Sequence, residues 1–427
     1  MSSKPVPAKR KTKPVVVDLF AGCGGFSLGL EQAGFETIFV NELHPDAMGT
    51  YLLNRQGTEL TKAQNHCFDI FDLTTNPDDL QSLARRMNRS WGEIDLVVGG
   101  PPCQGYSGIG HRRSFDITKE EIPSNHLYRE MAKVVTAVAP RAFVFENVRG
   151  LLTARWTPSG EKGEIWADVQ ATFKAITVKV GRKTLQYRIA SSLVHAKDYG
   201  VPQNRPRVLL VGIREDQPLS LNSNGVASGL LPEPHFGAPD LIDLLSDLAD
   251  PHWLPGGSTE RYFCEPANDF QLVARSRTDG SVAVAGDAVL EQEYSNHRPD
   301  VVTKFRHMLN NNGEIPAEMM TKKFAQRVLP ARWGSGGPTI TATSLPDDYV
   351  HYELPRVPTV REWARLQTFP DWYQFKGRRT TGGRRRAGDP SAGDWSRDLP
   401  KYTQIGNAVP SALGRCVGRH LRDLLGT

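Results

Sequence analysis

The chain has 427 residues, of which 39% are hydrophobic, 8% aromatic and 23% charged. This length can form two hydrophobic cores, and the composition excludes a largely disordered chain. The formal net charge of +5 permits a polyanionic partner without requiring one, and no stretch is long and apolar enough to span a membrane.

Residues 1–13 are basic and contain no apolar segment of the kind found in a signal peptide. We predict a disordered lead-in that can contact nucleic acid. The five cysteines are widely separated and form no CxxC pair, so the sequence indicates neither a metal site nor a disulfide framework. A reducing compartment, the cytoplasm, fits this use of cysteine best.

The first half of the chain alternates strand-like and helix-like segments. Apolar runs predict strands over residues 15–20, 37–41, 94–98, 142–145 and 208–213. Helical spacing predicts helices over residues 26–33 and 125–139. Such alternation is typical of the α/β class, and it predicts a doubly wound, mostly parallel sheet in a domain over residues 14–214.

A glycine-rich turn, Gly22–Gly25, joins the first predicted strand to the first predicted helix. Glu42 follows it after about 20 positions, which is the usual spacing of a nucleotide site. Backbone N–H groups of such a turn approach the ligand, and the carboxylate accepts from ribose hydroxyls. Phe26 and Ser27 replace the third glycine of the dinucleotide pattern, and Asp18 would repel a pyrophosphate. The pattern therefore suits S-adenosyl-L-methionine, whose end is zwitterionic and cationic, better than a dinucleotide. A generic glycine turn of an α/β fold is the alternative, and the turn alone does not decide between the two.

Cys103 lies in the segment Gly99–Ser107, directly after the predicted strand 94–98. Two prolines stiffen this turn, and the flanking glycines let a substrate come close. Ligands of open α/β sheets bind at the carboxyl ends of the strands. This position favours a nucleophile over a small buried hydrophobic residue, which is the usual alternative for a cysteine.

The alternation of strands and helices stops after Arg214. Residues 216–234 have the composition of a linker, and residues 239–248 predict a short acidic helix followed by an irregular region. Apolar positions over residues 409–425 fall close to one helical face, which predicts a terminal helix that returns to the first domain.

Together these segments resemble the cytosine-5 DNA methyltransferase family, in its prokaryotic restriction–modification form. The matching segments, in the family's order, are Asp18–Gly25, Glu42, Asp69-Ile70, Pro101–Gln104, Asn125–Tyr128, Glu146–Val148, Gln203–Arg207, Arg361–Asp371 and Gln404–Pro410. Phe68 departs from the family pattern, in which glycine is common. The resemblance covers about residues 14–214 and 330–427.

The resemblance implies that Cys103 is the nucleophile, which adds to carbon 6 of cytosine, and that Glu146 assists at N3. Asn147 would hold the turn that carries Cys103. Arg205 and Arg207 would pair with the base oxygen, with Glu146 or with a phosphate; two residues apart on one strand they would point the same way. The alternative for both arginines is a solvated basic edge.

The implied fold is that of S-adenosylmethionine-dependent methyltransferases, with a smaller, irregular target-recognition domain. The residues implied to bind the cofactor are Asp18, Phe20, Ala21, Gly22, Gly24, Gly25, Glu42, Asp69, Ile70, Pro101, Leu127, Asn407 and Ala408. No metal is implied.

The implied partner is duplex DNA, from which the target cytosine is flipped into the site. The target-recognition domain would span residues 215–400, and the segment 401–427 would return to the catalytic domain. An arginine-rich insertion, 376–387, is either a clamp on the DNA backbone or a solvated loop, and 339–343 is either an element near the flipped base or a Thr-rich strand. The candidate DNA-binding residues are Gln104, Ser107, Arg112, Arg113, Thr339, Thr341, Arg384 and Arg385.

Two other functions stay open at this point: a tRNA cytosine-5 methyltransferase and a catalytically silent DNA-binding paralogue. The long recognition region favours DNA over tRNA, and the intact Cys103 and Glu146 favour an active enzyme. We expect a cytoplasmic monomer, associated with the nucleoid if bacterial. The resemblance allows a cognate restriction endonuclease that acts separately, and the sequence does not show whether one is present.

Overall fold

The computed structural model of the chain describes residues 13–102, 123–218, 229–235, 237–320, 326–332, 338–340, 348–380 and 398–427. Several residues singled out above lie outside these ranges: Cys103, Gln104, Ser107, Arg112, Arg113, Thr341, Arg384 and Arg385. Among the described residues, no helix is long and apolar enough to cross a membrane.

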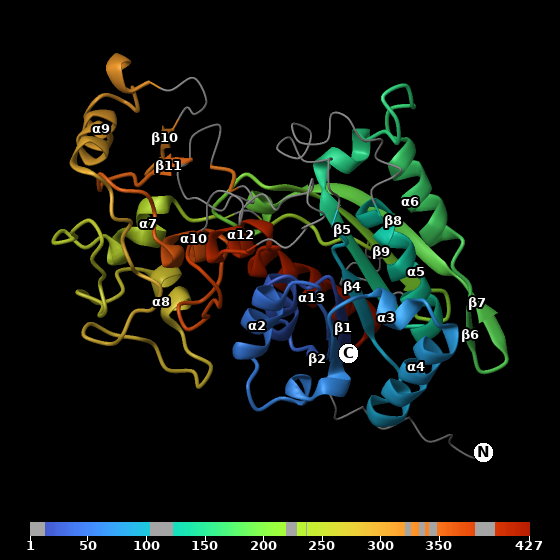
Figure 1. Ribbon diagram of the computed structural model, residues 1–427. Helices are drawn as coiled ribbons and strands as arrows, with labels where there is room; N and C mark the ends of the chain where they lie inside the picture. Colours follow the sequence, from blue (N-terminus) through green and yellow to red (C-terminus); the bar gives the residue numbers. More distant parts are fainter. Residues whose placement is uncertain are drawn as a thin grey trace.

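A seven-stranded sheet in the order β3-β2-β1-β4-β5-β9-β8 forms the larger half of the molecule (Figure 1). Its strands are β1 (Val15–Leu19), β2 (Glu36–Asn41), β3 (His66–Cys67), β4 (Leu96–Gly99), β5 (Ala142–Val148), β8 (Tyr187–His195) and β9 (Pro206–Arg214). The pairs among β1 to β5 are parallel, whereas β9 runs antiparallel to both β5 and β8. The predicted doubly wound, mostly parallel sheet is confirmed.

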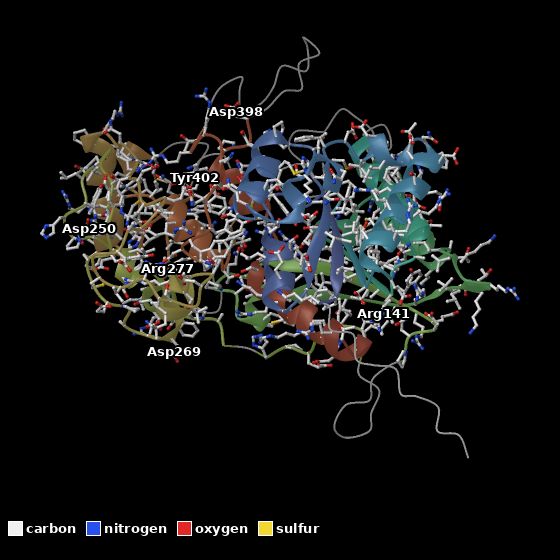
Figure 2. The ribbon with its side chains drawn as sticks, turned by 90° about the horizontal axis from the view of Figure 1, so that it is seen from below. Arg141, Asp250, Asp269, Arg277, Asp398 and Tyr402 are labelled. Atoms are coloured by element: carbon white, nitrogen blue, oxygen red, sulfur yellow. The ribbon has the colours of Figure 1, made fainter. Side chains whose placement is uncertain are left out.

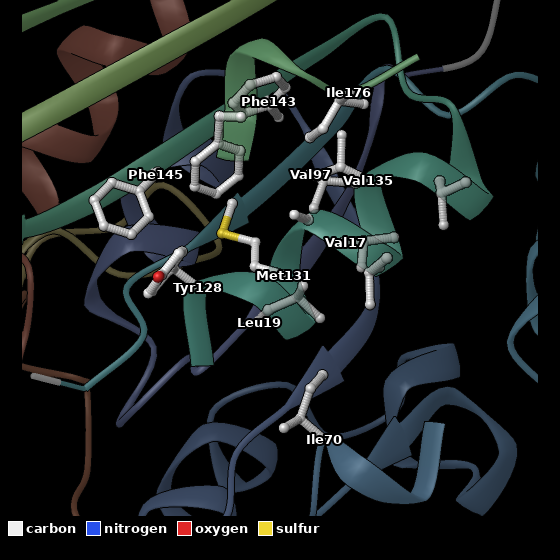
Figure 3. Packing of buried hydrophobic residues seen from close by; sticks show 14 of the residues in the cluster. Val17, Leu19, Ile70, Val97, Tyr128, Met131, Val135, Phe143, Phe145 and Ile176 are labelled. Carbon is white, nitrogen blue, oxygen red and sulfur yellow. The ribbon is translucent and has the colours of Figure 1, made fainter. Parts of the chain in front are cut away.

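Helices cover both faces of this sheet because alternate strand residues point to opposite sides. Val17 and Val97 face a core built with α4 (Pro77–Trp91), α5 (Leu127–Val138) and α6 (Glu164–Lys174). Figure 3 shows this packing, with Val17, Leu19 and Val97 close to Met131 and Val135 of α5. Val16, Leu96 and Val98 face the other core, which is built with α1 (Gly25–Gln32) and α13 (Ser411–Leu425).

The terminal helix α13 packs against α1 at very short range, through glycines on both helices. A Cβ atom on Gly29 would lie 2.2 Å from the carbonyl oxygen of Ser411, and one on Gly414 would lie 2.8 Å from that of Phe26. Only glycine permits such backbone contact. The end of the chain therefore returns to the first half, in line with the helical face found over residues 409–425.

Several local features differ from the sequence-based expectation. Strand β5 continues three residues beyond 145, because β9 extends its ladder as far as the pair Val148 and Arg207. The predicted helix 125–139 is a 3-10 turn, Pro123–His126, followed by α5. The short β3, the partly exposed β8 and the hairpin of β6 (Val178–Val180) and β7 (Lys183–Leu185) lack long apolar runs and were not expected.

The second half contains short elements joined by long irregular segments (Figure 1). The acidic segment 239–248 forms α7 (Leu241–Leu245) and a 3-10 turn (Ser246–Leu248), as predicted. The remaining α-helices and strands among the described residues are α2 (Pro45–Leu53), α3 (Phe71–Thr74), α8 (Asp269–Arg275), α9 (Pro299–Asn310), β10 (Arg327–Val328), β11 (Tyr349–Val350), α10 (Val360–Leu366) and α12 (Lys401–Asn407).

A third core joins the two halves of the molecule. Helices α10 and α12 pack together with Cys23 and Leu28, which belong to the glycine-rich turn and to α1. Figure 2 shows Tyr402 of α12 between the second half, marked by Asp250 and Arg277, and the sheet half, marked by Arg141. The segment 360–375 therefore belongs structurally to the junction of the halves.

Candidate active site

The carboxyl ends of the parallel strands meet at one edge of the sheet. Strand β9 runs in the opposite direction, so its first residues lie at the same edge, where Arg207 pairs with Val148. The strand order reverses between β1 and β4, which is where open α/β sheets bind their ligands. The described residues that directly follow β1, β2 and β4, and the end of β5, therefore lie at this edge.

The turn after β1 has the backbone shape of a ligand-binding loop. Phe20, Gly22 and Gly24 adopt positive φ angles of 56°, 57° and 86°. Glu42 Oε2 accepts the N–H of Gly22 at 2.9 Å, and its Oε1 accepts the N–H of His44 at 2.7 Å. Each carboxylate oxygen has a further lone pair, so Glu42 can still accept hydroxyl groups of a ligand.

Asp18 lies beneath this turn rather than on its surface. Its side chain is 2% exposed and accepts a hydrogen bond from the hydroxyl of Ser27. The hydroxyl of Tyr51 donates to the same Ser27 oxygen at 2.7 Å. Burial raises the pKa of Asp18 to about 7. We therefore propose that Asp18 supports the turn and does not contact the cofactor.

The other candidate cofactor residues surround the turn. Asp69 and Ile70 follow β3, and Asp69 Oδ1 accepts the N–H of Phe71 at 2.9 Å. Ala408 lies beside the turn, because a Cβ atom on Gly25 would be 3.3 Å from its Cβ. The remaining candidates are placed as follows: Asn407 is exposed, Leu127 half-buried at the start of α5, and Pro101 buried after β4.

Glu146 and Arg207 form a buried ion pair at the sheet edge. Arg207 Nε lies 2.7 Å from Glu146 Oε1, and their side chains are 12% and 9% exposed. Burial raises the pKa of Glu146, although the charges of Arg207 and Arg205 oppose the rise. A Cβ atom on Gly100 would lie only 3.0 Å from Glu146 Oε2, so the turn after β4 passes directly against this carboxyl group.

Asn147 connects β5 to the same turn. Its Nδ2 donates to the carbonyl oxygen of Pro101 at 3.0 Å, and its Oδ1 accepts the N–H of Val148 at 2.8 Å. The turn that leads to Cys103 is thereby fixed beside Glu146.

Arg205 and Arg207 have different surroundings, which the sequence alone did not distinguish. Arg205 precedes β9, so the two arginines do not share a strand. Arg205 Nη1 donates to the carbonyl oxygen of Ile340 at 2.8 Å, and Nη2 donates to those of Gly406 and Ala408 at 2.6 and 3.0 Å. Arg207 is the arginine that faces Glu146.

Thr339 lies next to this arginine segment. Its hydroxyl donates to the carbonyl oxygen of Asn204 at 2.7 Å, and residues 338–340 are in neither a helix nor a strand. Sequence reasoning missed Tyr373 and Arg55, which bind the backbone of the glycine-rich turn. Both lie far from the turn in the chain, so no local pattern could have indicated them.

The sheet order, the antiparallel β9 and the ligand turn after β1 define the class of S-adenosylmethionine-dependent methyltransferase folds. A DNA modification methyltransferase encoded within an Escherichia coli prophage has the same fold, with a TM-score of 0.64 and 21% identity over 97% of this chain and all 100% of that one. The family model of the C-5 cytosine-specific DNA methylases matches residues 15–423. The chain belongs to this family and is a DNA cytosine-5 methyltransferase.

Curated relatives match the chain over nearly its whole length. It is 30% identical over 421 residues to the Type II methyltransferase M.DdeI of Desulfomicrobium norvegicum, covering 95% of this chain and 88% of that protein. It is 29% identical over 436 residues to the Type II methyltransferase M.XorII of Xanthomonas oryzae pv. oryzae, covering 97% and 86% respectively.

Proposed function

We propose that this protein methylates carbon 5 of a cytosine within a specific duplex DNA sequence, through a covalent adduct between Cys103 and carbon 6. The observation that carries the proposal is the buried Glu146–Arg207 pair, 2.7 Å apart, beside the Pro101 turn that Asn147 holds. This arrangement puts an acid and a cation beside the Pro101 turn, which directly precedes Cys103 in the sequence.

We propose S-adenosylmethionine as the cofactor, which when bound supplies an electrophilic methyl group on its sulfonium. The free lone pairs of Glu42 suit the ribose hydroxyls, and the turn Gly22–Gly25 gives the ligand access to the backbone. Asp69 and Ile70 would contact the adenine, and Asn407 the amino-acid end. The residues present therefore fit this cofactor.

In the proposed reaction, the Cys103 thiolate forms a bond to carbon 6 while Glu146 gives a proton or a hydrogen bond to N3. The electron pair of the 5,6 double bond thereby becomes available at carbon 5. Carbon 5 then gains the methyl group, and S-adenosylhomocysteine leaves. Loss of the carbon 5 proton to water restores the 5,6 double bond and breaks the bond to Cys103, which leaves as the thiolate. N3 gives back to Glu146 any proton that it received.

The target base must leave the duplex before Cys103 can reach carbon 6. We propose that the segment 105–113 closes over the DNA, with contacts from Gln104, Ser107, Arg112 and Arg113. Thr339 and Thr341 would lie near the flipped base, and Arg384 and Arg385 would bind the DNA backbone. We also propose the domain division into residues 14–214, 215–400 and 401–427.

The protein would protect host DNA as one half of a restriction–modification system, acting separately from its endonuclease. This proposal is supported by the relatives, which are named Type II methyltransferases. We also propose that the protein acts as a monomer in the cytoplasm. A monomer suffices because the residues of the proposed site all belong to one chain.

The test is transfer of labelled methyl from S-adenosylmethionine to genomic DNA and, separately, to total tRNA, followed by base-resolution mapping. The wild-type protein is compared with Cys103→Ala and with Cys264→Ala, a change of a half-buried cysteine in the second half of the chain. We expect label in DNA cytosine with the wild type and with Cys264→Ala, and none with Cys103→Ala.

Label in tRNA alone would mean that the substrate is tRNA and not DNA. Absence of label from both nucleic acids would indicate a silent DNA-binding protein. Full activity of Cys103→Ala would overturn the covalent mechanism while leaving the substrate in place.

A further inference from the structure

A buried hydrogen-bonded junction joins three segments that lie far apart in the chain. It is centred on Gln203, Arg205 and Gln367, whose side chains are 0%, 2% and 0% exposed. The joined segments are residues 338–340, Gln367 directly after α10, and residues 405–408 at the end of α12. From the sequence, no role was expected for Gln203 or Gln367, and Arg205 was expected to share with Arg207 the pairing with the base oxygen, Glu146 or a phosphate.

On the recognition side, the junction holds the backbone of residues 338–340. The N–H of Asn204 donates to the carbonyl oxygen of Pro338 at 2.8 Å, and the Thr339 hydroxyl donates back to Asn204 at 2.7 Å. Arg205 Nη1 donates to the carbonyl oxygen of Ile340 at 2.8 Å. Three consecutive residues that lead to Thr341 are thus bound to the arginine segment.

On the cofactor side, Arg205 holds the two residues that flank Asn407. Its Nη2 donates to the carbonyl oxygens of Gly406 and Ala408 at 2.6 and 3.0 Å. One planar guanidinium group therefore binds residues 338–340 through one nitrogen and residues 406–408 through the other. A lysine could not reproduce this, because its ammonium group is a single point donor.

The two glutamines make a second, parallel connection. Gln203 Nε2 donates to Gln367 Oε1 at 2.8 Å, and Gln367 Nε2 donates to the carbonyl oxygen of Ile405 at 2.7 Å. In turn, Gln203 Oε1 accepts the N–H of Ile340 at 3.3 Å. The two glutamines thus join residues 338–340 to the end of α12 a second time, so displacement of one of these segments must disturb the other.

We propose that Arg205 is a positioning residue through which binding of target DNA and binding of the cofactor are energetically linked. The inference rests on the proposed function. A ligand that fixes either segment leaves less conformational freedom to be lost when the second ligand fixes the other. Linkage of this kind is reciprocal, and typical couplings correspond to roughly 5- to 150-fold in affinity.

The test measures the Kd of S-adenosylhomocysteine by calorimetry, with the protein alone and saturated with a short duplex carrying the mapped methylation site. This product binds without turnover. The readout is the ratio of the two Kd values, which we expect to be on the order of tenfold for the wild type. Arg205→Lys and Gln367→Met should reduce the ratio to near unity.

The matched control is Gln292→Met. Gln292 is also a buried glutamine of the second half, 2% exposed. Its amide donates to the carbonyl oxygen of Leu248 at 2.9 Å and accepts from the hydroxyl of Thr359 at 2.6 Å, and it hydrogen-bonds neither to residues 338–340 nor to residues 405–408. It should lower stability and keep the wild-type ratio. Loss of stability alone therefore cannot account for loss of linkage.

A wild-type ratio of unity would overturn the proposal, as would a wild-type ratio in both variants. If Arg205→Lys does not fold, as judged by circular dichroism, the Kd ratio of Gln367→Met alone decides: a ratio near unity supports the proposal, and the wild-type ratio overturns it. A wild-type protein that binds neither S-adenosylhomocysteine nor DNA would instead contradict the proposed function, which makes the two failures distinguishable.

Discussion

Glu146 holds a proton more readily than an exposed glutamate because its carboxyl group is buried at the end of β5. Arg207, 2.7 Å away, limits that rise of the pKa. The raised pKa suits the group to give a proton to the ring nitrogen of cytosine. It would become a poorer acid as the pH rises through its pKa.

We predict that Glu146→Gln lowers kcat by roughly 10²- to 10⁴-fold, the usual contribution of a general acid, while DNA affinity changes little. The alkaline decline of kcat that Glu146 causes should be absent from the variant's residual activity. Methyl transfer measured over a pH series checks both points. The control is Glu130→Gln, a change of a buried glutamate on α5 that pairs with Lys133. An unchanged kcat in Glu146→Gln would remove the acid from the mechanism.

A second prediction concerns Asp18, whose pKa burial raises to about 7 from an ordinary value near 4. Between these values the folded protein keeps a proton that the unfolded chain has lost. The free energy of unfolding must therefore fall as the pH rises through this window, by up to about 1.4 kcal/mol per pH unit, and level off above it.

The isosteric Asp18→Asn does not titrate, so it should lack this decline. Urea unfolding of both proteins is measured at several values from about pH 5 to about pH 8. The stability of the wild type relative to the variant should fall up to about pH 7 and then stay constant. Parallel stability profiles would show that Asp18 is ionised in the folded protein.

At the scale of elements, α1 and α13 meet backbone to backbone at their glycines. We predict that Gly29→Ala lowers the free energy of unfolding by about 1–3 kcal/mol or more, since its Cβ would lie 2.2 Å from the backbone oxygen of Ser411. Denaturant unfolding measures the loss.

The control for this prediction is Gly49→Ala, in the middle of α2. There the new Cβ would meet only the flexible side chain of Lys376, at 3.2 Å, and alanine should gain up to about 1 kcal/mol of helix propensity. Equal effects of the two substitutions would mean that α1 and α13 can move apart freely.

The sequence predicted most of the parallel strands because buried strands such as β1 and β4 are continuous apolar runs. It predicted β5 to end before Glu146, since polar residues usually end such a run, but the antiparallel partner β9 extends the ladder through Val148. It missed β8, whose mixed polar residues are mostly only partly buried. Both errors arise because the pairing of strands with one another is set by the fold and cannot be read from the local composition.

For the candidate site too, the sequence indicated residues next to predicted strands and did not indicate contacts between distant residues. The sequence singles out Glu146, Asn147 and Glu42 as candidates because they lie directly after predicted strands of the sheet, and their roles stay predictions. The difference between Arg205 and Arg207 was not found, because the carbonyl partners of Arg205 lie 135, 201 and 203 residues away. A position in a motif identifies a residue's chemistry, whereas its partner is set by the fold.

At the scale of the whole molecule, the second half of the chain holds the glycine-rich turn of the first half in place. The hydroxyl of Tyr373 donates to the carbonyl oxygen of Cys23 at 2.5 Å and accepts from Arg55 Nη1 at 3.2 Å. Arg55 is in turn paired with Glu31 of α1 at 2.8 Å. The turn that we propose as the cofactor loop is therefore shaped by a residue of the segment 360–375.

We predict that Tyr373→Phe raises the KM for S-adenosylmethionine several-fold while kcat at saturation changes little, because the turn loses its anchor and the reacting groups stay in place. The buried carbonyl of Cys23 is left unpaired, so the free energy of unfolding should fall by about 1–3 kcal/mol. The control is Tyr262→Phe, whose hydroxyl donates to Asp371 at 2.6 Å within the second half. It should cost similar stability without raising that KM. A KM that is equal in the two variants would mean that the turn holds its shape without the second half.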